Sequence, residues 1–245
     1  GLISKKQYQA LCPLYGNVLL SMALATIKYN PDGQPKRVKY QIVTLGNLNL
    51  YAWEKKDCFA LIMSQLDFRL LVSRAVNDRC ILKNLDINQA FCQSKLPENG
   101  KYVVQSPPGS LLTPNNTYLL LLKTLYGPKQ SPRHWYNNAK MILTNMGLKQ
   151  CPIAPCLFYG KLFDNKRPIY VGLYVDDIIY YSKDPTVESH FEKEIATKVT
   201  KIELLGKTSY FLGFKFEWIE HYDRELTCKM NQEAFAENFD TTGRI

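Results

Sequence analysis

The sequence predicts a mixed α+β fold, and three observations support this prediction. Patterns with apolar residues at helical spacing are interspersed with short strand patterns along the 245 residues. Hydrophobic residues make up 46% of the chain, which is enough for a sizeable core. Charged residues make up only 22%, which argues against general disorder. We therefore expect one large domain or two or three subdomains.

The first expected element is a β-hairpin over residues 23–43. Residues 30–33, Asn-Pro-Asp-Gly, supply the turn, because proline fixes φ and glycine accepts a positive φ. The second strand of this hairpin is basic, with Lys36, Arg37 and Lys39.

Three segments carry helical patterns: residues 64–77, 131–147 and 184–199. Ser64 is a suitable N-cap for the first helix, and Ser131 for the second. The apolar face predicted for the second helix consists of Trp135, Ala139, Ile142 or Leu143, and Met146. That of the third helix consists of Val187, Phe191, Ile195 and Val199.

Short strand patterns occupy the segments between the helices. One strand lies within residues 80–91 and ends near Asp86, and a buried strand begins at residue 118. Two short strands flank an Asp-Asp pair at 176–177, and a strand pair is expected within 209–218.

The charge balance indicates a polyanionic partner. Thirty-one Lys and Arg residues against 22 Asp and Glu give a net charge of +9, and nucleic acid is the first candidate. A merely basic soluble protein is the alternative. Seven cysteines without a CxxC pair, and only three histidines, argue against a zinc site or a disulfide framework and favour an intracellular protein.

No membrane association is expected from the sequence. The most apolar uncharged run, residues 11–27, is too short and too interrupted to span a bilayer, and it leads directly into the hairpin pattern, which argues against a signal peptide. The chain opens with Gly1, so we expect it to be part of a longer protein.

Asp176 and Asp177 are two adjacent acids in the apolar stretch GLYVDDIIYY. Consecutive side chains of a strand point to opposite faces, so the two can share a site only at a tight hairpin. The alternative is that they merely form the turn, but the flanking residues are strand formers rather than turn formers. Clustered carboxylates repel, and Mg²⁺ or Mn²⁺ would remove that repulsion. A two-metal site needs a further acid, and Asp86 is the candidate.

Four motifs occur in order along the chain: LDINQAF, LKTLYGPKQSPRHWY, LYVDDIIYYS and YFLGFKF. With this order the chain resembles the reverse transcriptases of copia-type retrotransposons, from about residue 20 to the C-terminus. The resemblance implies a right-hand polymerase fold, in which a palm of antiparallel sheet backed by helices carries a fingers subdomain, with the thumb largely missing. It implies fingers at 1–63 and 97–131, palm at 64–96 and 132–218, and the start of a thumb at 219–245.

The resemblance also implies roles for single residues. Asp86, Asp176 and Asp177 match the catalytic acids that bind two Mg²⁺ or Mn²⁺ ions. Phe91 matches a steric gate against the ribose 2′-OH. The implied dNTP-binding set is Lys36, Arg37, Lys39, Ile87, Asn88, Gln89, Phe91, Tyr126, Gly127 and Lys129. The implied primer and template set is Gln130, Tyr174, Val175, Phe211, Leu212 and Gly213.

The implied activity is RNA-directed DNA synthesis from dNTPs on an RNA or DNA template–primer. The family context implies attached RNase H and integrase domains and a cytoplasmic virus-like particle. Two departures stand out, because the family usually has Arg where Gln41 stands and a larger apolar residue where Pro128 stands. They leave a second reading open, a degenerate copy that binds nucleic acid but polymerises poorly. A third reading is another two-metal enzyme such as a nuclease.

Overall fold

The computed structural model describes most of the chain. The described residues are 2–4, 6–7, 18–29, 34–48, 54, 58–96, 102–109, 117–162, 167–233 and 236. The predicted turn at 30–33 and the last part of the expected thumb lie outside them. The chain divides into unit 1, Gly1–Ala60 with Gln89–Asn138, and unit 2, Leu61–Asn88 with Ala139–Ile245.

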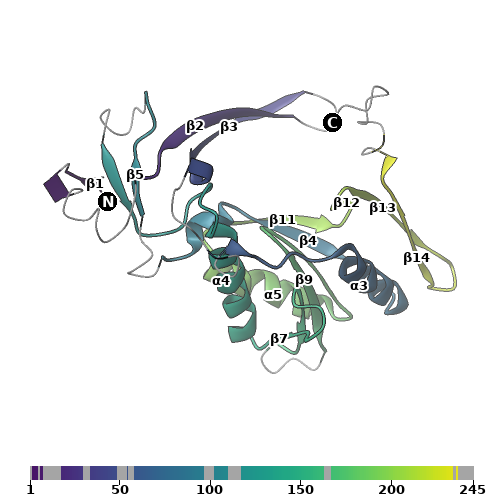
Figure 1. The fold of residues 1–245 in the computed structure, drawn as a ribbon. Coiled ribbons are helices and arrows are strands. Elements are labelled where there is room, and N and C mark those ends of the chain that lie inside the picture. Colours follow the sequence, from purple (N-terminus) through teal and green to yellow (C-terminus); the bar gives the residue numbers. More distant parts are fainter. Residues whose placement is uncertain are drawn as a thin grey trace. The chain divides into compact units, whose positions relative to one another are not determined.

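Unit 1 contains two small antiparallel sheets (Figure 1). One has the strand order β1-β6-β5, and the other is a two-stranded ribbon of β2 and β3, which confirms the predicted hairpin. A small apolar cluster of Leu19, Leu96, Tyr102 and Val104 packs beside Leu121. The bounds are β1 (Leu2–Ile3), β2 (Ser21–Tyr29), β3 (Pro35–Thr44), η1 (Gly46–Leu48), η2 (Ala90–Gln93), β5 (Tyr102–Gln105) and β6 (Tyr118–Leu121).

Unit 2 is built on a six-stranded antiparallel sheet with the order β11-β4-β10-β9-β8-β7, accompanied by a three-stranded sheet β12-β13-β14. The mixed α+β class with antiparallel sheets is therefore confirmed. The bounds are α3 (Gln65–Asn77), β4 (Lys83–Ile87), β7 (Lys149–Gln150), β8 (Leu157–Gly160), β9 (Ile169–Tyr174), β10 (Asp177–Ser182), α5 (Pro185–Lys198), β11 (Ile202–Lys207), β12 (Tyr210–Phe211), β13 (Phe214–Glu220) and β14 (Leu226–Asn231). Helix α4 (Ser131–Asn145) begins in unit 1 and ends in unit 2.

Helices α3 and α5 of unit 2 begin within one residue of the predicted segments, and Ser64 takes its predicted capping role. Ser64 caps α3 through a capping box with Asp67, and Asp184 caps α5 by accepting the Thr186 N–H. These caps satisfy N–H groups that have no partner within the helix. The predicted apolar face of α5, from Val187 to Val199, is buried throughout.

Helix α4 differs in one detail from the expectation. It begins at Ser131 itself, one residue before the predicted first position. The Ser131 hydroxyl donates to the Leu125 carbonyl at 2.7 Å, so it ties the helix start to the preceding loop. The apolar face is nevertheless as predicted, with Trp135, Ala139, Leu143 and Met146 buried.

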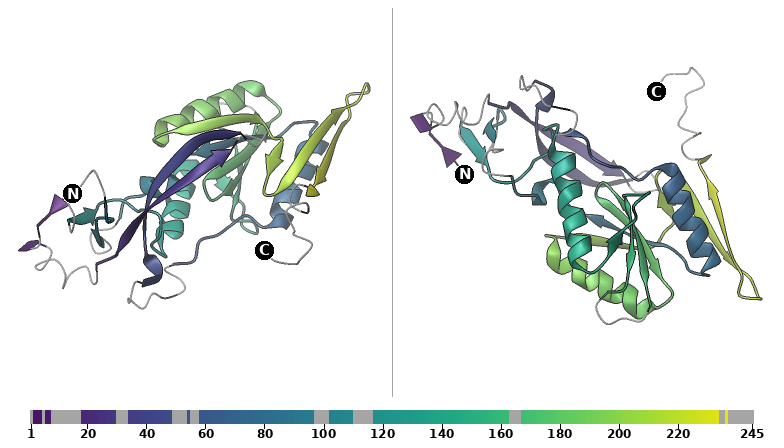
Figure 2. Two further views of the ribbon diagram at one scale, coloured as in Figure 1. Left: turned by 90° about the horizontal axis from the view of Figure 1, so that it is seen from above. Right: turned by 60° about the horizontal axis from the view of Figure 1, so that its bottom comes forward.

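Two helices cover opposite faces of the six-stranded sheet (Figure 2, right). The Phe191 ring of α5 lies 5.0 Å from the Tyr180 ring on one face. On the other face, Leu71 of α3 packs so close to Gly172 that an added Cβ would come within 3.0 Å of it. Gly172 pairs with Ile179, and Ile179 shares its face with Asp177, so α3 covers part of the face that carries Asp177.

Among the described helices, none combines the length and the apolar character needed to cross a membrane. The six described cysteines are all free thiols.

Candidate functional site

The central strands of unit 2 bring the three predicted acids together. In the antiparallel pairing of β10 with β4, Asp177 lies directly opposite Asp86. The Ile87 N–H donates to the Asp176 carbonyl at 2.8 Å. This bond joins the residue after Asp86 to the residue before Asp177. Asp86 and Asp177 therefore form a non-hydrogen-bonded pair, the position at which cross-strand side chains approach most closely.

The backbone reversal between β9 and β10 places Asp176 beside this pair. Tyr174 pairs with Asp177, so only Val175 and Asp176 form the loop. Val175 has a φ of +53°, a conformation that a β-branched residue rarely adopts. Strain of this kind often accompanies functional sites. The hairpin therefore differs slightly from the expectation, because Asp176 lies in the turn while Asp177 is already the first residue of β10.

The electrostatics of the site follow from burial and from like charge. The three aspartates are half-buried. Burial first, and then the neighbouring charges of Asp176 and Asp86, together raise the pKa of Asp177 to about 6. Two like charges directly opposite on a sheet are destabilising. The site therefore favours a bound cation, because positive charge offsets the repulsion between the acids.

The donor set fits a hard divalent cation. Carboxylate oxygens are the ligands that Mg²⁺ and Mn²⁺ prefer, and the pairing register places two of the three acids on one face of the sheet. In the part of the chain that the structure describes, no group of three or more His, Cys, Asp or Glu side chains has its ligand atoms already gathered for a metal ion. Binding would thus require rotation of the carboxylates on a backbone that already holds them as neighbours.

One acidic neighbour was missed by the sequence reasoning. Glu203 on β11 pairs with Asp86 from the side opposite Asp177, so three acids lie in a row across β11, β4 and β10. Glu203 is exposed. No motif marks it, because its position follows only from which strand lies beside β4.

The predicted primer-contacting residues of unit 2 also lie together. The ring of Phe211 contacts that of Tyr174 edge-on at 6.3 Å, and Tyr174 is the cross-strand neighbour of Asp177. Phe211 pairs with Phe214 around the two-residue turn Leu212-Gly213, in which both residues have positive φ.

The Phe68 ring of α3 lies 5.5 Å from that of Phe211 and 5.9 Å from that of Phe214. This aromatic packing fixes the β12–β13 turn to α3, which also packs against the central sheet through Leu71. The turn is thus held next to the strand that leads into the acids.

In unit 1, two of the predicted nucleotide-binding residues contact each other. The rings of Phe91 and Tyr126 meet edge-on at 5.0 Å. Thr124 donates its hydroxyl to the Phe91 carbonyl, and its N–H donates to the Ser94 carbonyl at 2.9 Å. The segment before Tyr126 is thus bonded to the segment that carries Phe91.

The end of β3 is clamped onto the turn that contains Tyr126 and Gly127. The Thr44 N–H donates to the Tyr126 carbonyl at 2.8 Å, and the buried Thr44 hydroxyl donates to the same oxygen at 3.2 Å. A Cβ on Gly46 would lie 2.1 Å from the Gly127 carbonyl oxygen, and a Cβ on Gly127 would lie 1.9 Å from that of Thr44. Only glycines permit this approach of two backbones.

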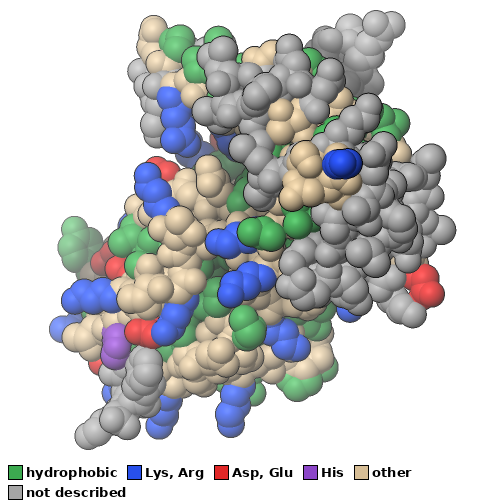
Figure 3. Space-filling model, turned by 90° about the vertical axis from the view of Figure 1, so that its left-hand side faces the viewer, with side chains coloured by type: hydrophobic (Ala, Val, Ile, Leu, Met, Phe, Trp, Pro, Cys, Tyr) green, Lys and Arg blue, Asp and Glu red, His purple; other side chains and the backbone are tan. Residues whose placement is uncertain are grey.

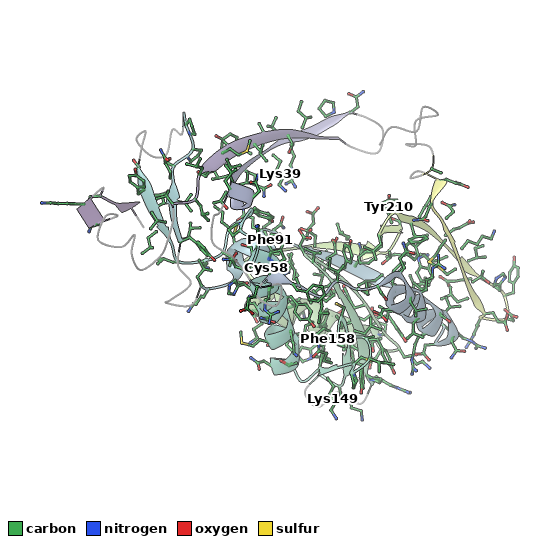
Figure 4. The ribbon with its side chains drawn as sticks, in the orientation of Figure 1. Lys39, Cys58, Phe91, Lys149, Phe158 and Tyr210 are labelled. Carbon is green, nitrogen blue, oxygen red and sulfur yellow. The ribbon has the colours of Figure 1, made fainter. Side chains whose placement is uncertain are left out.

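The basic residues predicted to bind the triphosphate lie on β3. Arg37 and Lys39 are exposed and share one face of the ribbon with Gln41, because alternate residues of a strand face the same way (Figure 4 labels Lys39). Lys36 belongs to the same strand. Lys129, in the loop before α4, is also exposed.

The remaining predicted residues fall at the junction of the units or inside unit 1. Ile87 ends β4, Asn88 donates its N–H to the Lys201 carbonyl, and Gln89 has a φ of +53° where the chain passes into unit 1. Gln130 is only 2% exposed, and its side-chain amide has no hydrogen-bond partner among the described residues. The predicted residues thus form two sets, one in each unit, and their roles remain predictions.

Comparison with known proteins adds independent findings. The family described as "Reverse transcriptase (RNA-dependent DNA polymerase)" matches residues 25–239. The chain is 29% identical over 191 residues to the "Retrovirus-related Pol polyprotein from transposon RE1" of Arabidopsis thaliana, which covers 78% of this chain and 13% of that protein. It is 26% identical over 216 residues to the corresponding polyprotein from transposon TNT 1-94 of Nicotiana tabacum, which covers 86% of this chain and 16% of that protein.

A solved structure of a foamy viral protease-reverse transcriptase in complex with double-stranded DNA is similar at a TM-score of 0.35 and 10% identity, covering 79% of this chain and 29% of that one. The chain spans about 13 to 16% of the length of the two polyproteins.

Proposed function

Because the chain belongs to the reverse transcriptase (RNA-dependent DNA polymerase) family, we propose that it is the fingers and palm of a copia-type reverse transcriptase. The proposed reaction is attack of a primer 3′-OH on the α-phosphate of a dNTP, directed by an RNA or DNA template, with release of pyrophosphate. The observation that carries the proposal is the cross-strand pair of Asp86 and Asp177 with Asp176 beside it.

The acids act by holding divalent cations. Asp86, Asp176 and Asp177 would hold two Mg²⁺ or Mn²⁺ ions, which when bound supply an activated 3′-oxygen and neutralise charge on the pyrophosphate leaving group. The raised pKa of Asp177 supports this role, because a nearby cation removes the repulsion that raises it. Holding Asp86 and Asp177 on paired strands fixes their separation before substrate arrives, which favours catalysis by positioning.

Other residues of the chain orient the two substrates. The N–H groups of Ile87 and Asn88 already donate to the Asp176 and Lys201 carbonyls. Within the predicted segment 87–89 we therefore assign the contact with the triphosphate oxygens to the Gln89 N–H. Phe91, fixed against Tyr126, would exclude a ribose 2′-OH. The turn of Phe211, Leu212 and Gly213 would direct the primer 3′ end, because it packs on Tyr174 next to Asp177.

A second candidate, a copy that binds nucleic acid but polymerises poorly, draws support from Gln41 and Pro128. Gln41 lies on the same face of β3 as Arg37 and Lys39, where a third cation would strengthen contacts to a triphosphate. Pro128 weighs less, because its carbonyl accepts the Ser131 N–H at 3.1 Å and so takes part in the start of α4. The metal ligands are present in either case.

The wider context of the proposal comes from the relatives. Because both are Pol polyproteins, we propose that RNase H and integrase domains accompany this chain and that it acts in a cytoplasmic virus-like particle. dNTPs and a template–primer are its proposed substrates.

Primer extension on poly(rA)–oligo(dT) with Mg²⁺ or Mn²⁺ tests the function. Asp176→Asn should lower the extension rate by at least about 10³-fold, at the upper end of what losing one electrostatic group costs, while template binding persists. Asp223→Asn, in the β13–β14 loop, is the matched control and should extend like the unchanged chain.

Template binding without dNTP incorporation by the unchanged chain, and by a longer piece of its own reading frame, would select the second candidate. Metal-dependent strand cleavage without dNTP use would select a nuclease instead.

A further inference from the structure

The net positive charge of the chain is confined to one unit. Unit 1 contains 13 Lys and Arg against 4 Asp and Glu, which gives +9, whereas unit 2 contains 18 of each and is neutral. The whole net charge of the molecule therefore resides in unit 1. Figure 3 shows one face of the molecule on which Lys and Arg side chains recur with few acids between them. A charge distribution this uneven creates a field that attracts polyanions to one part of the protein.

Within unit 1, two lysines face each other across a β-bridge. Lys95 and Lys123 form an isolated antiparallel bridge. The hydrogen bonds beside it run from the Leu96 N–H to the Leu122 carbonyl at 3.2 Å and from the Thr124 N–H to the Ser94 carbonyl at 2.9 Å. They flank the lysine pair, so it occupies a non-hydrogen-bonded position, where the Cα atoms are about 4.5 Å apart and side chains are closest.

Such a pair is unfavourable for folding by itself. Like charges directly opposite on a sheet destabilise it. Both lysines are exposed, and neither forms an ion pair with any residue that the structure describes. Two neighbouring lysines that pair with no described acid form a site for an anion that approaches from solvent.

The position of the pair relates it to the nucleotide-binding residues of unit 1. Thr124 follows Lys123, and its hydroxyl bonds to the Phe91 carbonyl. Tyr126, which contacts the Phe91 ring, comes two residues later. An anion held by Lys95 and Lys123 is thus attached to the same bonded segments that orient Phe91 and Tyr126.

We propose that Lys95 and Lys123 form a phosphate-binding site for the sugar–phosphate backbone of the template–primer. The inference rests on the proposed function, and it goes beyond that function by naming a contact to the nucleic acid outside the implied dNTP-binding and primer–template sets. A free dNTP is the other source of phosphate. The backbone is favoured because unit 1 carries a surplus of +9, which is more positive charge than a single triphosphate would neutralise.

The salt dependence of binding tests this site. Affinity of the 245-residue chain for a fluorescein-labelled template–primer is measured by anisotropy between 50 and 300 mM KCl. Each of Lys95→Gln and Lys123→Gln should make the slope of log K against log salt shallower by about 0.9, the value for one lost duplex phosphate contact. Lys149→Gln, an exposed strand lysine opposite Tyr159 in unit 2, is the matched control and should keep the original slope.

A charge reversal separates binding from folding. Lys95→Glu replaces a repulsive pair with an attractive one, so Tm should stay the same or rise while the affinity falls and the slope becomes shallower. A change of Tm with an unchanged slope would mean that the pair serves the sheet only, and the proposal would be wrong. A raised KM for dNTP with an unchanged slope would assign the site to the free triphosphate and would equally overturn it.

The outcome is independent of catalysis. The Asp176→Asn chain should bind with the original slope even though it does not extend primers. If the unchanged chain shows no extension but the lysine variants flatten the slope, the phosphate site stands and the polymerase proposal fails. If the unchanged chain extends primers but the lysine variants keep the original slope, the phosphate site is wrong and the polymerase proposal stands.

Discussion

Units 1 and 2 each place a like-charged pair at the closest position of an antiparallel pairing, within a sheet in unit 2 and in an isolated bridge in unit 1, and the two pairs have opposite sign. Asp86 and Asp177 occupy it in unit 2, and Lys95 and Lys123 occupy it in unit 1. The acids are half-buried in a neutral unit, whereas the lysines are exposed in a unit of +9. On the two proposals, the half-buried acids serve as a localised site for small cations, and the exposed lysines serve as a salt-sensitive contact for a polyanion.

On the proposed function, unit 1 selects the nucleotide and unit 2 carries the phosphoryl chemistry. Phe91→Ala tests the assignment of nucleotide selection to unit 1, and among the variants that follow it should have the largest effect. Removing the ring that Tyr126 supports should reduce discrimination against ribonucleotides by roughly 10- to 200-fold, the range for a changed apolar contact. The ratio of kcat/KM for dTTP and UTP measures it.

Phe59→Ala is the control, because Phe59 is 52% exposed in the same unit and should leave the ratio unchanged. Unchanged discrimination in Phe91→Ala as well would remove the steric-gate role.

Gly46→Ala should have the next largest effect, on the clamp between β3 and the Tyr126 turn. The added methyl would meet the Gly127 carbonyl oxygen at 2.1 Å, so one backbone has to move. We expect a loss of about 1–3 kcal/mol in the free energy of unfolding, as for overpacking, together with a higher KM for dNTP. Urea unfolding and steady-state kinetics measure the two.

The exposed neighbour Asn47 provides a control, since Asn47→Ala should change stability by less than about 0.5 kcal/mol. Equal stability of the two variants would show that the clamp is not tight in solution.

Gln41→Arg adds a further positive charge to unit 1, on the face of β3 that carries Arg37 and Lys39. A charge-assisted contact to the triphosphate should lower the KM for dNTP by roughly three- to tenfold, since one net hydrogen bond contributes about 1 kcal/mol. Val38→Arg adds the same charge to the opposite face of the ribbon and should not lower KM. A similar gain from both variants would indicate nonspecific attraction.

The smallest effect concerns the pH dependence of stability. The pKa of Asp177 is raised from 3.8 to about 6 in the folded chain, so its ionisation favours the unfolded state. The penalty is absent below pH 4, grows between pH 4 and 6, and is complete above pH 6. Without divalent ions, the Tm of Asp177→Asn should therefore equal that of the unchanged chain at pH 4. At pH 7 it should be about 2–4 °C higher. Coincident melting at both pH values would contradict the repulsion.

Much of the fold follows from local sequence signals. Ser64 and Asp184 mark helix starts because their side chains bond to free N–H groups, and the four-residue spacing from Val187 to Val199 marks a buried face. The strands around the acids also follow from their residue types. These signals act over a few residues, so they can be read without tertiary context.

Features that depend on strand neighbours could not be predicted. Glu203 and the Lys95–Lys123 bridge become visible only when β11 is seen beside β4 and residue 95 beside residue 123. The clamp of Gly46 on Gly127 joins segments 81 residues apart, and nothing local marks either glycine for it. The positive φ of Val175 is equally hidden, because valine normally avoids it.

Thermal unfolding with increasing Mn²⁺ at pH 7.5 tests the central claim, that the acids at the β4–β10 pair form a divalent cation site. A ligand that binds only the folded chain raises Tm with its concentration. The account predicts a saturable rise for the unchanged chain and for Asp223→Asn, and little or no rise for Asp177→Asn. An equal Mn²⁺-dependent rise in Asp177→Asn would contradict it.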